Sequence, residues 1–136
     1  PIGKSIVARE GTDITLLGAA YTTVVCLETA DMLAARGYSA EVVDLLSVSP
    51  LDEAIILDSV RKTRKIVIVD EDYPRCSFAS DVSALVAEQA FEHLDGPITR
   101  VAGPDVPAMP FSPPLEAVYM VDAARIADAM RRLAEY

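Results

Sequence analysis

The sequence predicts a three-layer α/β/α domain built on a mostly parallel sheet of about five strands. Three observations predict this fold class. Strand-length apolar runs alternate with helical periodicity from residue 14 onward, a pattern that gives right-handed crossovers between parallel strands. The 136 residues, 51% hydrophobic and 24% charged, suit one globular domain. Residues 65–69, KIVIV, are nearly all apolar, which indicates a central strand covered on both faces.

The first part of the chain alternates strand, strand, helix, strand. Residues 4–9 form the first predicted strand, which we place at an antiparallel edge, and residues 14–17 form the second. Apolar positions at helical spacing predict an amphipathic helix over about 22–36, with Gly37 as its C-terminal stop. Residues 39–48 then predict a third strand.

The next helix has a well-marked predicted start. Ser49 is expected to cap it, Pro50 to occupy its first helical position, and the acids at 52–53 to lie in its first turn. Those acids oppose the positive end of the helix dipole, which favours a start at this place.

The remaining elements follow the strand at 65–69. A helix is predicted over 79–92 and a fifth strand over 97–103. Residues 104–114 carry five prolines, which predicts a stiff and irregular loop. A final helix is expected over about 122–135.

Charge and cysteine content exclude several classes of function. A net charge of −9 and a pI near 4.5 argue against nucleic acid and anionic membranes, and suit a basic protein partner. No apolar stretch approaches the ~20 residues that a bilayer span needs. Cys26 and Cys76 lack a CxxC spacing and are expected to be reduced thiols. These features predict a cytoplasmic location.

The acid run Asp70, Glu71 and Asp72 directly follows the predicted strand at 65–69. Carboxylates at the carboxyl end of a strand suit a hard cation or acid–base chemistry, and a solvated turn is the plain alternative. A phosphate-accepting receiver domain is a further alternative. That class needs acids after its first strand and a lysine after its last, and the strands at 14–17 and 97–101 offer neither.

Motifs for self-contained chemistry are missing from the sequence. It has no GxGxxG or GxxxxGK[ST] phosphate loop and no GxSxG elbow. Its single histidine, His93, lies at a predicted helix end without a nucleophile in its surroundings. The residues themselves therefore offer no familiar phosphate-binding loop, no nucleophile elbow and no catalytic histidine, and one histidine with two distant cysteines does not suggest a zinc site.

Three segments, at 3–20, 39–71 and 78–116, together carry a family resemblance that covers nearly the whole chain. They include the REGTD turn and the run LDGPITRVAGPD. The chain resembles the C-terminal, transketolase-like domain of the β subunit of the thiamine-diphosphate-dependent decarboxylase component of 2-oxoacid and acetoin dehydrogenase complexes.

The resemblance implies that residues 1–136 are one domain of a longer β subunit whose N-terminal, thiamine-binding domain is absent. The full enzyme would use thiamine diphosphate and magnesium, neither of them bound by this domain. The implied partners are an α subunit, a second β subunit and a lipoyl acyltransferase core. The domain's role would be assembly and docking, without catalysis of its own.

Two positions inherit a docking role from the resemblance. Asp95, in the LDGP turn, and the terminus at Tyr136 match carboxylates that receive basic side chains of the core's peripheral subunit-binding domain. Paired carboxylates on an acidic domain would hold arginine or lysine. The alternative for Asp95 is a simple turn residue before Gly96.

The loop at 70–77 is the most distinctive segment within the resemblance. Its DEDYPRCS pattern is closest to acetoin-cleaving members. The family places this loop at a subunit junction or at the border of the active site, where Arg75 would meet a substrate carboxylate or a neighbouring acid. Cys76 is expected to be a buried small hydrophobe. The competing class is a stand-alone domain that binds a small molecule or phosphate.

Overall fold

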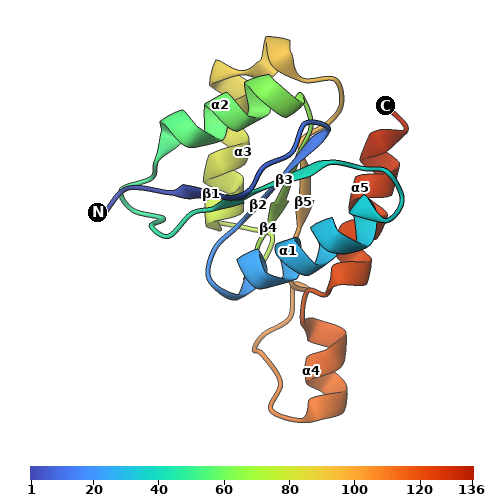
Figure 1. Ribbon diagram of the computed structural model, residues 1–136. Helices are drawn as coiled ribbons and strands as arrows, with labels where there is room; N and C mark the ends of the chain where they lie inside the picture. Colours follow the sequence, from blue (N-terminus) through green and yellow to red (C-terminus); the bar gives the residue numbers. More distant parts are fainter.

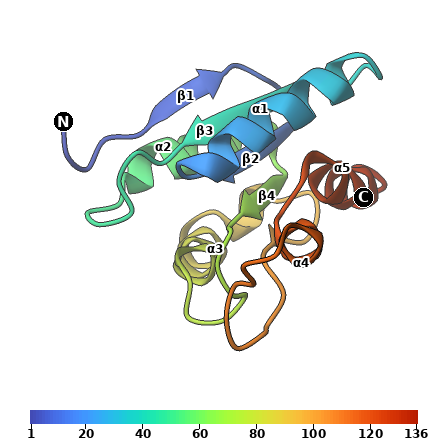
Figure 2. The ribbon, with the colours of Figure 1, turned by 90° about the horizontal axis from the view of Figure 1, so that it is seen from below.

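The computed structural model describes residues 1–136 as a five-stranded sheet between two helical layers (Figure 1). The strand order is β1-β3-β2-β4-β5, and it can be followed from β1 to β4 from below in Figure 2. Only the edge pair of β1 and β3 is antiparallel. The strands are β1 (Ile6–Arg9), β2 (Ile14–Gly18), β3 (Ala40–Asp44), β4 (Ile66–Val69) and β5 (Thr99–Val101). The predicted fold class is confirmed, with its antiparallel edge strand.

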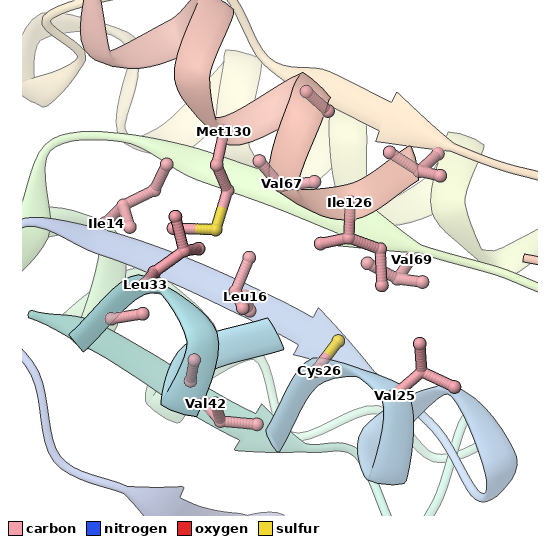
Figure 3. Packing of buried hydrophobic residues seen from close by; sticks show 14 of the residues in the cluster. Ile14, Leu16, Val25, Cys26, Leu33, Val42, Val67, Val69, Ile126 and Met130 are labelled. Carbon is pink, nitrogen blue, oxygen red and sulfur yellow. The ribbon is translucent and has the colours of Figure 1, made fainter. Parts of the chain in front are cut away.

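Two hydrophobic clusters bind the helices to opposite faces of the sheet. One cluster joins the sheet to α1 and α5, and Figure 3 shows its side chains meeting between those helices and strands β2 to β4. The other joins it to α2 and α3. Every residue of β2 is buried, since the middle strand is covered on both faces. The helices are α1 (Tyr21–Ala34), α2 (Glu53–Thr63), α3 (Phe78–Gln89), α4 (Pro113–Tyr119) and α5 (Ala123–Ala134), with a 3-10 turn at Phe91–His93.

The predicted stop at Gly37 is correct. Gly37 has a φ of +87°, in the left-handed region that favours glycine, and its amide donates to the Ala34 carbonyl. The outer face of α1 differs from the expected polar face, because Val24 and Met32 are 54% and 48% exposed.

The predicted start of α2 at Ser49 is wrong. Val48 and Leu51 form an isolated antiparallel bridge, which closes a turn around Ser49 and Pro50. The helix begins at Glu53 instead. Asp52 precedes it without capping it, since its carboxylate accepts from the Ser5 amide at 3.1 Å. A long-range contact to the N-terminal segment thus replaces the predicted local cap.

Two predicted elements end earlier than the sequence predicts. The third strand stops at Asp44, whose Oδ1 accepts from the Thr23 hydroxyl at 3.0 Å and from the Leu46 amide at 3.3 Å. The helix predicted over 79–92 stops as α3 at Gln89, and Phe91, expected on its apolar side, is 71% exposed.

The proline-rich segment contains a helix that the sequence prediction missed. Pro113 and Pro114 occupy the first positions of α4, where their missing amide hydrogens cost nothing. Figure 1 shows α4 and the loop before it projecting away from the rest of the fold. We call residues 104–119 the arm. No helix of the chain combines the length and apolarity that a membrane crossing requires.

Candidate functional site

The acid run after β4 forms an ordered turn whose carboxylates do not converge. Asp70 is 3% exposed, and its amide donates to the Val101 carbonyl at 2.9 Å. Its Oδ1 accepts from the Asp72 amide at 3.1 Å, whereas its Oδ2 is buried without a partner. Glu71 and Asp72 are exposed. No group of three or more His, Cys, Asp or Glu side chains is placed to hold a metal ion together.

The same turn forms the base of the arm. The Gly103 amide donates to the Asp72 carbonyl at 3.0 Å, which fixes the point where the arm leaves β5. Tyr119, the last residue of α4, is 7% exposed, and its ring lies 3.3 Å from the position that a Cβ on Gly103 would take. Burial raises the pKa of the Tyr119 hydroxyl. Both ends of the arm are therefore held against the turn.

Arg75 and Cys76 lie on the outer side of this base. Arg75 forms an ion pair with Asp105 at the start of the arm, so its nearest acid belongs to its own chain. The expectation that Cys76 is buried is wrong: it is exposed, and its φ of 54° places it in the left-handed region. Both cysteines are free.

The arm carries an apolar surface that the sequence prediction did not single out. Its large hydrophobic side chains include Phe111 at 99%, Val118 at 76% and Leu115 at 58% exposed. Apolar residues in a proline-rich segment without a strand or helix pattern were the available signal. Surfaces of this kind mark sites of protein–protein contact.

Asp95 and Tyr136 lie at one edge of the fold. The Arg64 guanidinium donates to both carboxylate oxygens of Asp95, each at 2.7 Å. These hydrogen bonds lower the pKa of Asp95. A Cβ on Gly96 would lie 3.2 Å from the Cβ of Tyr136, so the turn that carries Asp95 packs against the C-terminal residue. The structure brings the two predicted docking positions together.

Residues 3–126 match the family described as Transketolase, C-terminal domain. The chain belongs to this family. Similar proteins of this transketolase C-terminal family include the 2-oxoisovalerate dehydrogenase subunit beta of Bacillus subtilis, 44% identical over the whole chain and 42% of the relative. The acetoin:2,6-dichlorophenolindophenol oxidoreductase subunit beta of the same organism is 48% identical over 88% of the chain and 35% of the relative.

A third relative is the mitochondrial pyruvate dehydrogenase E1 component subunit beta of Dictyostelium discoideum, 42% identical over 99% of the chain and 38% of the relative. This transketolase C-terminal domain thus spans about two-fifths of the curated relatives that it matches. Among solved structures, the inactive beta4 tetramer of a split gene transketolase has a TM-score of 0.87 at 27% identity, over 99% of this chain and 43% of that chain. Family membership removes the receiver alternative.

Proposed function

We propose that this domain is the assembly and docking part of the β subunit of a thiamine-diphosphate-dependent dehydrogenase. The whole enzyme would oxidatively decarboxylate a 2-oxoacid or cleave acetoin, and would pass the acyl group to a lipoyl acyltransferase. Relatives named for three such substrates support this proposal, with identities between 42% and 48%. The two free cysteines suit the reducing cytoplasm, where we place the enzyme.

Thiamine diphosphate and magnesium would be held elsewhere in that enzyme. The carboxyl ends of the strands, where open α/β sheets bind their ligands, offer no cluster of three metal-ligating side chains and no glycine-rich phosphate loop. When bound to the other domains, the cofactor would supply the carbanion chemistry of decarboxylation. This domain would border that site through the turn at 70–77 at most.

The exposed apolar surface of the arm is the observation that best supports the proposed assembly role. Phe111, Leu115 and Val118 present apolar side chains on a projection whose two ends are fixed. Burial of such side chains stabilises an association by about 1.5–3 kcal/mol each. We assign this surface to the contact with a second β subunit.

The arm is tested by the self-association of the 136-residue chain in analytical ultracentrifugation. We expect Phe111→Ser and Val118→Ser to shift the chain toward monomer and to leave its circular dichroism spectrum unchanged, because both side chains are exposed. Met32→Ser, at a 48% exposed position on α1, is the matched control. A chain that stays monomeric, or that responds equally to Met32→Ser, contradicts the assignment.

The edge with Asp95 and Tyr136 would receive basic side chains of the lipoyl acyltransferase's peripheral subunit-binding domain. Arg64 occupies one hydrogen-bonding site on each Asp95 oxygen, and further acceptor sites remain for an incoming cation. The net charge of −9 would attract a basic partner to the domain as a whole.

Calorimetric titration with that basic domain tests the docking role. We expect Asp95→Asn to weaken binding about tenfold or more, the value of a lost charge-assisted hydrogen bond, and added salt to weaken it further. Asp58→Asn is the control, because Asp58 also pairs with an arginine at an exposed position. Equal affinity for the wild type and Asp95→Asn contradicts the role.

A further inference from the structure

A cavity of about 340 Å³ opens between α1, α5 and the amino-terminal ends of β2 and β4. The turn at 70–77 and the base of the arm lie at the carboxyl end of β4, at the other end of the sheet. The cavity is therefore separate from that turn and from the arm. It borders the edge of Asp95 and Tyr136, because Lys65 follows Arg64 in the chain and Ala134 lies two residues before Tyr136. Its volume falls in the range of small-molecule sites, about 300–1,000 Å³.

The floor of this cavity is apolar. Ile14, Leu33 and Met130 line it and are only 3%, 4% and 2% exposed. Figure 3 shows these three side chains gathered between the C-terminal part of α1, the start of β2 and α5. Ala127 and Ala134 also line the cavity, and their short side chains leave room above this floor.

The rim of the cavity holds cations that have no partner. Of the twelve lysine and arginine side chains, seven pair with carboxylates and two donate to backbone carbonyls. Arg36, Lys65 and Arg132 make neither kind of contact, and the first two line this cavity. Lys65 contributes to the lowered pKa of Asp95 but forms no ion pair with it. Two cations without an ion pair thus lie beside one apolar hollow on a chain with a net charge of −9.

The other charged groups around the cavity are already engaged. Arg131 donates to Asp128 at 2.7 Å. Asp13 accepts from the Ser39 amide at 2.8 Å and from the Thr12 hydroxyl at 2.9 Å. Asp13 keeps its negative charge because both of its donors are neutral, and Asp128 balances Arg131. Arg36 and Lys65 together outweigh Asp13, so the rim carries a net positive charge.

We propose that this cavity binds a small anionic amphiphile, a carboxylate on an unbranched apolar chain. The chain lies against the floor formed by Ile14, Leu33 and Met130. The carboxylate accepts hydrogen bonds from the Arg36 guanidinium and the Lys65 ammonium, which gives charge-assisted contacts at the rim. A neutral ligand would forgo those contacts, and a cationic one would be repelled.

Octanoate is the probe, followed by amide chemical shifts of the ¹⁵N-labelled chain. We expect saturable shifts at residues lining the cavity, with octanol weaker and octylamine without effect. Affinity should rise about fourfold for each methylene from butanoate to octanoate, because each buried methylene contributes about 0.8 kcal/mol. No shifts with octanoate at millimolar concentration, or equal binding of octanoate and octanol, overturns the proposal.

Variants separate the two parts of the site. Arg36→Gln and Lys65→Gln should each weaken octanoate about tenfold and leave octanol unchanged, the loss expected for a charge-assisted hydrogen bond. Arg132→Gln removes an equal charge outside the cavity and should have no effect. Ala127→Leu fills the hollow and should weaken octanoate and octanol alike. If Arg132→Gln matches the rim variants, binding is non-specific and the assignment is wrong.

Discussion

Glu41 is a buried carboxylate on β3, and one lysine compensates its charge in the folded chain. Its side chain is 1% exposed, and its Oε1 accepts from the Ser59 hydroxyl at 2.6 Å. Its Oε2 pairs with the Lys62 ammonium, which also binds Glu10 at 2.8 Å. Removing Lys62 leaves a buried charge with a single neutral donor. We therefore expect Lys62→Met to be strongly destabilising.

The magnitude follows from the burial of the two partners. Loss of one partner of a buried ion pair costs about 3–5 kcal/mol. The Lys62 side chain is 41% exposed, so water already screens part of the pair and the lower end applies. About 3 kcal/mol would lower the unfolding temperature of a domain of this size by roughly 10 °C.

Urea unfolding followed by circular dichroism measures this loss. Arg61→Met is the matched control. Arg61 directly precedes Lys62 on α2 and pairs with Asp58, which is exposed, so its loss should cost under about 1 kcal/mol. Glu41→Gln added to Lys62→Met should restore most of the stability, because the amide carries no charge and still accepts from Ser59. Equal losses for the two single variants, or no recovery in the double variant, would show that Lys62 does not stabilise a buried Glu41 charge.

Three further predictions concern other parts of the fold. Burial raises the pKa of the Cys26 thiol to about 12, so a thiol reagent at pH 8 should modify Cys76 alone in the native chain, and a Cys76→Ser variant should not react. The hydrogen bonds from Arg64 lower the pKa of Asp95. The ionised Asp95 therefore stabilises the fold above the ordinary carboxyl pKa, and this stabilisation is lost as the pH falls through the lowered pKa. The unfolding free energies of wild type and Asp95→Asn should accordingly converge in acid. A Cβ on Gly11 would lie 2.2 Å from backbone atoms of β3, so Gly11→Ala should cost more in thermal unfolding than Gly37→Ala, where the space is open and the cost is the backbone strain of about 1–2 kcal/mol.

The sequence predicts this fold well wherever local chemistry decides it. The apolar run at 65–69 and the glycine stop at Gly37 depend on neighbouring residues, and both predictions hold. The start of α2 does not depend on its neighbours alone. Asp52 is engaged by Ser5, forty-seven residues away, a contact that no local pattern reveals.

The candidate site also combines features that the sequence predicts with features that depend on long-range contacts. The resemblance singled out Asp95 and Tyr136, and the structure places them at one edge. The sequence could not reveal Arg64 as the partner of Asp95, because the two side chains meet only when α2 and the turn before β5 are folded. The exposure of Cys76 follows from a left-handed backbone conformation that its sequence neighbours do not announce.

The paired state of Asp95 has a consequence for how a partner is recognised. A carboxylate held by two arginine hydrogen bonds is already oriented, so little side-chain freedom remains to be lost on docking. The pair has no net charge and attracts little from a distance. Encounter would then be governed by the overall negative charge of the domain, and Asp95 would act only at contact, where it distinguishes correctly placed cations from misplaced ones. Substitution of Asp95 should therefore speed dissociation and leave the association rate nearly unchanged.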